Sequence, residues 1–149
     1  MVTNLVKFLL PVAVHVVFIR ESKVLLARRV GTGFEDGKYG LVGGHLDGGE
    51  TLKQAAAREC EEEVGVDLTP DELEALGMEH YTSPTGEGID FYFRATSWRG
   101  EPYARAECDE VRWFSLDDLP PDIVPFMRDA VKRFESGSQW FNEIGWTSA

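Results

Sequence analysis

Short apolar runs separated by polar turns dominate this chain and predict β-strands. β-branched residues fill most of 12–19, and 24–28 is a second apolar run. The short polar connection between these two runs predicts a hairpin, because antiparallel neighbours can be joined by a tight turn. Further strands are expected at 39–42, 73–81, 90–97 and 111–116.

Two other segments have the apolar spacing of helices. The first covers 52–64. Thr51 precedes it and Gln54 follows three residues later, which is the pattern of a capping box, and Gly65 suits a left-handed stop. The second covers 123–134, and the pattern predicts no element in the aromatic tail from Ser136 onward. Strands interleaved with helices predict an α/β or α+β domain with helices packed on a mixed sheet.

Length and charge restrict the class of protein. The chain has 149 residues, which predicts one domain over 1–149. Its formal net charge of −11 repels polyanions, so we expect no binding to nucleic acid polymers or to a membrane surface. The apolar run 5–19 is too short for a membrane helix, and no signal-peptide cleavage site follows it. With two cysteines, too few for a disulfide scaffold, we expect a cytoplasmic protein.

Acidic side chains crowd the C-terminal half of the first predicted helix. At about 100° per residue, Glu59, Glu62 and Glu63 lie on one arc beside an apolar arc that contains Cys60. Each like-charged pair costs about 0.2–0.5 kcal/mol. A solvated helix face would tolerate this cost, whereas a bound divalent cation would reverse it, and carboxylates suit hard ions such as Mg²⁺, Mn²⁺ and Ca²⁺. The charges alone leave both interpretations open.

The residues around this helix distinguish the two interpretations. Residues 43–66 read GGHLDGGETLKQAAARECEEEVGV, with Gly44, Glu50, the run 58–63 and Gly65 at fixed intervals. This segment closely resembles the Nudix box, the signature of the Nudix hydrolase family. The polar and glycine positions match the signature, whereas Cys60 stands at an aliphatic position and Val42 stands where many relatives have proline.

The resemblance implies the Nudix fold, a mixed β-sheet sandwiched between helices, and a pyrophosphohydrolase in which water attacks phosphorus. It also implies Mg²⁺ as the cofactor, with Mn²⁺ as a substitute, because cations must neutralise an anionic transition state. The implied metal ligands are the carbonyl of Gly44 and the carboxylates of Glu59, Glu62 and Glu63. The implied catalytic residues are Glu59, Glu62, Arg58 and Glu50. Glu59 is an alternative general base, Arg58 orients the carboxylates and Glu50 braces Arg58.

Residues outside the box complete the predicted site. Some relatives use a further acid from the loop before the last strand, for which Glu107 is the first candidate, followed by Asp109 and Glu110. The expected substrate contacts are Arg28, Arg29, Lys38 and Tyr81. Because Arg28 and Arg29 are adjacent on a strand, only one of them can face the site.

The sequence leaves the substrate open. A nucleoside triphosphate is the first expectation, and a dinucleoside polyphosphate, a nucleotide sugar or ADP-ribose is the alternative. A noncatalytic nucleotide-binding module is a different class of function, but such modules normally lose box acids, and none is lost here. A homodimer is considered because the aromatic tail with Trp140 and Trp146 could cover the core or pack on a second subunit. His15, on an apolar strand, is expected to be a core histidine with its hydrogen bonds satisfied.

Overall fold

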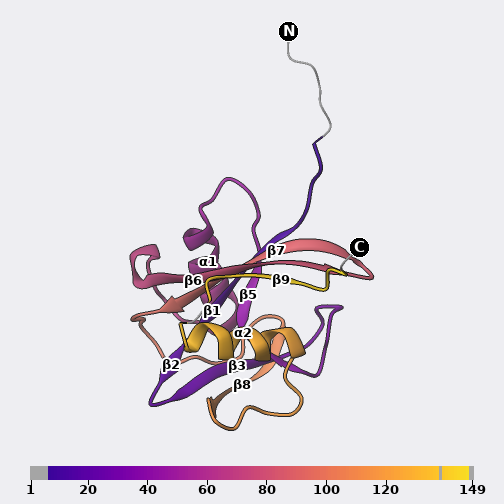
Figure 1. The fold of residues 1–149 in the computed structure, drawn as a ribbon. Coiled ribbons are helices and arrows are strands. Elements are labelled where there is room, and N and C mark those ends of the chain that lie inside the picture. Colours follow the sequence, from indigo (N-terminus) through magenta and orange to yellow (C-terminus); the bar gives the residue numbers. More distant parts are fainter. Residues whose placement is uncertain (1–6, 138, 148–149) are drawn as a thin grey trace.

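The computed structural model describes residues 7–137 and 139–147, which Figure 1 traces from indigo to yellow. Its elements in chain order are β1 (Val12–Val17), β2 (Ile19–Arg20), β3 (Lys23–Arg29), β4 (Tyr39–Gly40), β5 (Val42–His45), α1 (Leu52–Val64), the 3-10 turn η1 (Pro70–Glu72), β6 (Leu73–Ser83), β7 (Gly86–Ala95), β8 (Cys108–Ser115), α2 (Pro125–Glu135) and β9 (Phe141–Ile144). Each segment predicted from the apolar pattern contains the expected kind of element, with its ends shifted by a few residues.

The strands form two sheets. Sheet A has the order β5-β1-β7-β6-β9, and sheet B has the order β2-β3-β4 with β8 also paired to β3. Within sheet A, β1 runs antiparallel to β5 and parallel to β7. β6 is antiparallel to β7 and parallel to β9. Sheet A is therefore a mixed sheet, as the interleaving of strands and helices predicted.

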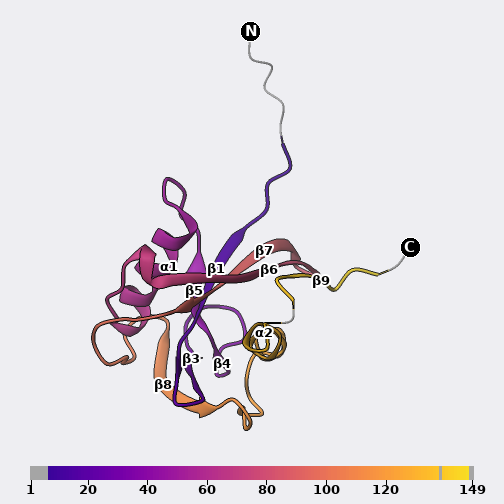
Figure 2. The same cartoon turned by 60° about the vertical axis from the view of Figure 1, so that its left-hand side comes forward.

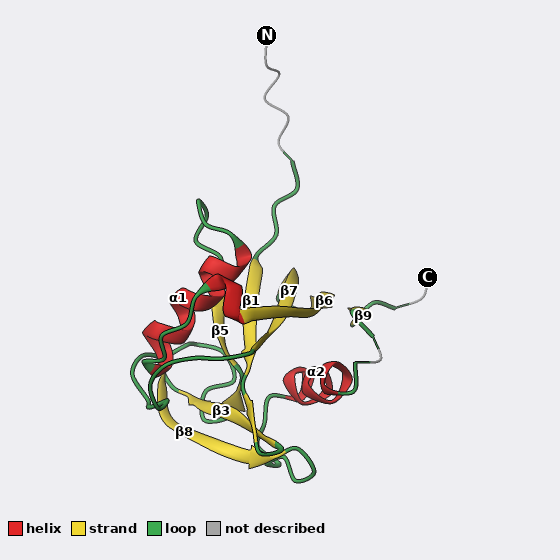
Figure 3. Cartoon of the chain, turned by 90° about the vertical axis from the view of Figure 1, so that its left-hand side faces the viewer, coloured by secondary structure: helices red, strands yellow, loops and turns green. Residues whose placement is uncertain are grey.

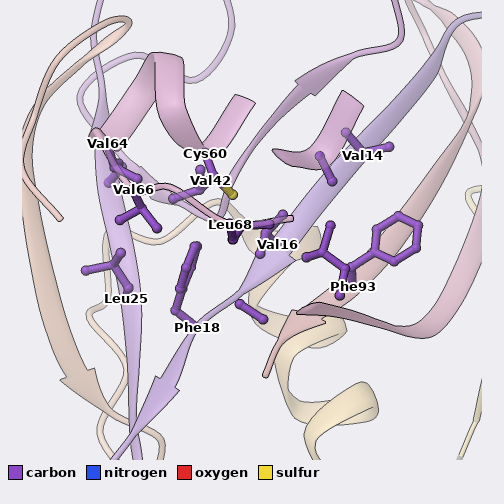
Figure 4. Packing of buried hydrophobic residues seen from close by; sticks show 14 of the residues in the cluster. Val14, Val16, Phe18, Leu25, Val42, Cys60, Val64, Val66, Leu68 and Phe93 are labelled. Carbon is purple, nitrogen blue, oxygen red and sulfur yellow. The ribbon is translucent and has the colours of Figure 1, made fainter. Parts of the chain in front are cut away.

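Alternating side chains divide the interior into two cores. One core lies against α1 and includes Val14, Val16, Leu25, Cys60 and Val64 (Figure 4). The other lies against α2 and includes Val17, Leu26, Met127, Val131 and Phe134. Neighbouring residues of one strand point into different cores because strand side chains alternate. α1 and α2 therefore cover opposite sides of β1 and β3 (Figures 2 and 3), and the expected mixed sheet sandwiched between helices is confirmed.

α1 begins and ends where the sequence pattern places it. The Thr51 hydroxyl accepts a hydrogen bond from the backbone N–H of Gln54 at 3.1 Å, and the Gln54 side chain accepts one from the backbone N–H of Thr51 at 2.8 Å. Gly65 ends the helix with φ at 68°, a left-handed conformation that glycine adopts without a steric penalty. These two ends fix which side chains of α1 face the sheet.

The predicted hairpin between 12–19 and 24–28 is only partly correct. Ile19 and Arg20 do pair with β3, through a turn at Glu21 and Ser22 with φ of 53° and 62°. Val12–Val17, in contrast, belongs to sheet A. The chain changes sheets at Phe18, whose ring is buried 5.0 Å from that of Trp98. Because β1 and β3 are each buried on both faces, the apolar pattern runs through the change without a break.

Two other elements differ from the prediction. No strand was predicted within the glycine-rich stretch 43–49, but Gly43 and Gly44 pair with His15 and Val14 as part of β5. β9 was not predicted at all. It adds a parallel edge strand to β6, and its four residues are too few and too weakly alternating to produce a strand signal.

The apolar N-terminal run and the cysteines have structural roles. Positions 5 and 6 of the run 5–19 lie outside the described residues, and most of its remainder forms β1 and the start of β2. Within residues 7–137 and 139–147, no helix combines the length and apolar character that a membrane span requires. Cys60 and Cys108 are both buried and free.

Candidate active site

Glycines on β5 allow this strand to approach the acids of α1 closely. A Cβ atom at position 44 would lie 2.5 Å from the Oε1 atom of Glu59, and one at position 43 would lie 2.0 Å from the backbone oxygen of Val14. Such distances require residues without a side chain. The backbone N–H of Gly43 donates a hydrogen bond to Glu63. The glycines therefore bring the backbone of β5 into contact with the carboxyl groups of the helix.

The three predicted metal-binding acids of α1 have different surroundings. Glu59 and Glu63 lie one helical turn apart and are each only 8% exposed. Glu62 is half exposed and faces Arg58. Glu61, which is not part of the predicted site, forms an exposed ion pair with Arg105. A purely solvated acidic helix face is therefore the wrong interpretation for Glu59 and Glu63.

The buried acids resist ionisation. Burial, followed by the nearby charge of Glu59 and a smaller effect of Glu107, raises the pKa of Glu63 to about 9. Burial also raises the pKa of Glu59, although the Arg58 guanidinium opposes that shift. Without a cation, ionisation of both neighbouring carboxyl groups is unfavourable. A cation bound between them makes the doubly ionised form favourable.

Arg58 connects the box acids to one another. Its Nη2 and Nε atoms donate to the two carboxylate oxygens of Glu50 at 2.8 and 3.1 Å. Its Nη1 atom donates to Glu59 at 2.9 Å and to Glu62 at 3.3 Å. Nη2 also donates to the backbone oxygen of His45 at the end of β5. Arg58 is held by Glu50 and holds the two acids, which is the arrangement that its predicted positioning role requires.

Glu107 approaches the acids from the loop before β8. Its backbone has φ at 60°, and its carbonyl accepts a hydrogen bond from the N–H of Val30 at 3.0 Å. Its side chain lines the same cavity as Gly44 and Glu63. Asp109 and Glu110 instead form ion pairs with Arg28 at 2.8 and 3.5 Å. Among these three acids, Glu107 has the position that a further metal ligand would need.

The four predicted substrate contacts separate into two groups. Arg29 and Tyr81 line the cavity next to the acids. Arg29 donates to the backbone oxygen of Phe34 at 2.8 Å, and its guanidinium lies over the Phe34 ring. Arg28 and Lys38 are engaged elsewhere, Arg28 with Asp109 and Lys38 with Glu35. Of the adjacent pair Arg28 and Arg29, it is Arg29 that faces the cavity.

A cavity of about 570 Å³ extends from the acids across sheet A toward α2, and we call it the central cavity. Its lining includes residues that were not predicted as site residues: His15, Glu79, Asp90, Phe34 and Phe126. The sequence does contain a signal for two of them, since His15 and Asp90 are polar positions within apolar strands. The expectation that His15 has satisfied hydrogen bonds is wrong, because both of its ring nitrogens are buried and neither has a partner in the described part of the chain.

The donor atoms suit a hard divalent cation, although the acidic side chains are not yet arranged around a single metal position. Within the described residues, no three His, Cys, Asp or Glu side chains already converge on one point. The oxygens available are the carboxylates of Glu59, Glu62 and Glu63 and the carbonyl of Gly44, and oxygen ligands are those that Mg²⁺ and Mn²⁺ prefer. The raised pKa of Glu63 is further support, because a cation would offset the charge that the protein disfavours.

Comparisons with known proteins agree with this geometry. A family model described as the NUDIX domain matches residues 9–134. The 8-oxo-dGTP diphosphatase of Escherichia coli (strain K12) is 30% identical over 121 residues, which cover 78% of this chain and 92% of that protein. The crystal structure of the MutT NUDIX hydrolase from Burkholderia pseudomallei superposes with a TM-score of 0.76 and 27% identity, covering 84% of this chain and 98% of that one.

A second relative is considerably longer than this chain. The NAD-capped RNA hydrolase NudC of Pseudomonas aeruginosa (strain LESB58) is 35% identical over 117 residues. The matched part is 78% of this chain but 40% of that protein. The similarity therefore leaves most of that relative without a counterpart in this chain.

Proposed function

This chain belongs to the Nudix family, and from that premise we propose that it is a pyrophosphohydrolase of nucleoside diphosphate derivatives with Mg²⁺ as its cofactor. The observation that carries the proposal is the buried pair Glu59 and Glu63, packed against Gly44 at one end of the central cavity. A cavity of this size accommodates a nucleotide. Family members generally use divalent metal ions, and the oxygen-only donor set of this chain supports Mg²⁺, with Mn²⁺ as a substitute.

The residues proposed to hold the metal are Glu59, Glu62, Glu63, Glu107 and the carbonyl of Gly44. A bound divalent ion supplies positive charge that stabilises the anionic diphosphate and its transition state. Arg58 keeps Glu59 and Glu62 in place, and its own orientation is set by the bidentate contact with Glu50. An arginine fork is suited to this positioning because it is planar and always charged.

In the proposed reaction, a water oxygen forms a bond to phosphorus while the bridging P–O bond of the anhydride breaks. The water proton passes to a carboxylate of the chain. Glu59 is our proposed general base in the alternative in which it does not bind the metal, because it is buried beside Glu63 and held by Arg58. Glu62 is the alternative, since it lies on the same face of α1 and contacts the same guanidinium.

A nucleoside triphosphate is the first substrate candidate. The Escherichia coli relative, which this chain matches over 92% of its length, is named for a nucleoside triphosphate. The Pseudomonas aeruginosa relative is named for NAD-capped RNA, so a dinucleotide linkage is the second candidate. The formal charge of −11 disfavours binding to the body of an RNA chain.

A hydrolysis screen with Mg²⁺ or Mn²⁺ tests the proposed function. The substrates are nucleoside triphosphates, dinucleoside polyphosphates, ADP-ribose, nucleotide sugars and NAD-capped RNA. We expect cleavage of at least one class and complete loss of activity when EDTA is added. Nucleotide binding without hydrolysis in any arm would contradict the proposal and would favour a noncatalytic nucleotide-binding module.

A further inference from the structure

A histidine and an aspartate face each other in the central cavity without a hydrogen bond between them. His15 is 7% exposed and Asp90 is 5% exposed. The Nε2 atom of His15 lies 3.6 Å from the Oδ1 atom of Asp90, which is beyond hydrogen-bond distance. Both ring nitrogens of His15 are buried and have no partner among the described residues. Buried polar groups are normally paired, so this pair has unused hydrogen-bonding capacity.

The neighbouring polar groups cannot satisfy this capacity, because they are engaged with one another. Glu79, fully buried beside Asp90 in sheet A, accepts hydrogen bonds from the Tyr92 hydroxyl at 2.7 Å and from Arg133 at 2.5 Å. His15 itself stacks on the Tyr92 ring at 5.0 Å, which fixes its plane. Asp90 is thus an acceptor in the cavity lining beside an imidazole whose plane is fixed.

The walls around this pair suit a flat ring. Phe34 and Phe126 lie 6.3 Å apart at the cavity wall, and Phe126 meets His15 edge-on at 6.4 Å. Leu41, Met127 and Ile144 add apolar surface to the same cavity. The acids Glu63 and Glu107 belong to the lining of the cavity as well. A ligand with a planar heterocycle and a polyphosphate group would match both parts of the cavity. The heterocycle would contact the apolar walls around His15 and Asp90, and the polyphosphate would lie near the acids Glu63 and Glu107.

We propose that His15 and Asp90 recognise the base of the substrate and that they select guanine over adenine. This inference rests on the proposed function, because it assigns the base that accompanies the cleaved diphosphate. A carboxylate only accepts hydrogen bonds, and it binds best to two adjacent donors. Guanine presents such donors at N1–H and its 2-amino group, with the O6 acceptor next to them, where an N–H of His15 can donate. Adenine presents one donor group and a ring acceptor on the corresponding edge, and that acceptor would face the carboxylate unfavourably.

Binding of mononucleotides without metal tests this recognition separately from hydrolysis. The measurement is calorimetric titration of GMP and AMP in EDTA, for the wild type, Asp90→Asn and His15→Phe. We expect the wild type to bind GMP at least about tenfold more tightly than AMP, because an unmet buried hydrogen-bonding group penalises the wrong base. Asp90→Asn replaces one acceptor by a donor. The preference of this variant for GMP over AMP should therefore be about tenfold smaller than that of the wild type, or reversed.

His15→Phe separates recognition from a structural role. The phenyl ring keeps the stacking on Tyr92 but removes the two unpaired nitrogens, so we expect a higher Tm together with weaker GMP binding. His80→Phe is the matched control, since His80 lies on β6, pairs with Glu87 and is outside the cavity lining. A lower Tm with unchanged GMP binding in His15→Phe would assign His15 a structural role and overturn its part in the proposal.

The ratio of kcat/KM for GTP and ATP with Mg²⁺ provides the second readout. Unchanged base preference in Asp90→Asn, in both binding and hydrolysis, would overturn the inference even if the enzyme cleaves nucleotides. Equal or tighter binding of AMP to the wild type would overturn it as well. Absence of hydrolysis in every arm would count against the proposed function, whereas GMP selectivity in EDTA would still support the base site.

Discussion

The carboxyl groups of Glu59 and Glu63 lie within reach of a shared hydrogen bond on one buried face of α1. In the metal-free protein, burial raises the pKa of both groups, and the nearby charge of Glu59 further disfavours the ionised form of Glu63. The capping box at Thr51 and the left-handed stop at Gly65 fix this pairing, because they determine the length and rotation of the helix. The cost of holding these two acids together is the physical basis of the first predictions.

Replacing Glu63 by Gln should reduce turnover by at least about a hundredfold, because it removes a charge that holds the metal against the diphosphate. The fold should be retained, since Gln has the same shape and the pKa of Glu63 is already raised in the metal-free protein. Steady-state kinetics and circular dichroism check both points. Glu61→Gln is the matched control on the same helix, because Glu61 is exposed and pairs with Arg105. Near-wild-type turnover in Glu63→Gln would remove Glu63 from the site.

In EDTA, the stability of the protein should fall as the pH rises from about 5 to about 9. The pKa of Glu63 is raised to about 9, above the value of 4.5 that applies in the unfolded chain. Over this range the unfolded state releases a proton that the folded state retains, so the stabilisation present at low pH is lost on the way to pH 9. Thermal unfolding at several pH values measures the effect. Glu63→Gln should reduce the slope, and an identical slope in that variant would contradict the assignment.

Gly44→Ala should weaken Mg²⁺ binding and turnover by at least about tenfold, because a 1 Å displacement of a catalytic group is already costly. The added Cβ atom would lie 2.5 Å from the Glu59 carboxylate and must displace it. Position 44 has no positive φ, so the backbone itself should accept alanine. Mg²⁺ titration and thermal unfolding check the effect. Combining Gly44→Ala with Glu59→Ala removes the clash, and a stability penalty that persists in the double variant would show that its origin lies elsewhere.

Arg133→Met should destabilise the protein by about 3–5 kcal/mol, because it leaves a buried charge without its partner. Arg133 donates to Glu79, whose side chain is 1% exposed, and α2 is thereby connected to sheet A. Urea unfolding measures the loss. Adding Glu79→Gln to Arg133→Met should recover part of it, and no recovery would mean that packing, not the charge, accounts for the effect.

The sequence predicted the helix that carries the candidate acids better than it predicted the burial of those acids. The capping residues and the helix could be predicted because each depends on neighbours within one helical turn, whereas the roles of the acids were predicted through the resemblance to the Nudix box. The burial of Glu59 and Glu63 depends instead on Gly43 and Gly44 forming a strand, which in turn requires pairing with β1. No local pattern contains that information.

The central cavity was not predicted for a related reason. His15 and Asp90 come from β1 and β7, strands far apart in the sequence that become parallel neighbours only in the folded sheet. Each alone is a single polar residue in an apolar strand, for which a core position is the ordinary interpretation. The direction of the chain at Phe18 and the addition of β9 also depend on contacts between distant segments.

The position of β1 between β5 and β7 also affects the order of folding. Val12 pairs with Ile89, so β1 meets its parallel neighbour β7 only after the intervening strands β2 to β6 have been synthesised. Such distant pairings slow folding and leave apolar strands exposed in the meantime. We expect truncated chains that end before β7 to aggregate, and we expect productive collapse to wait for the β6–β7 hairpin to emerge from the ribosome.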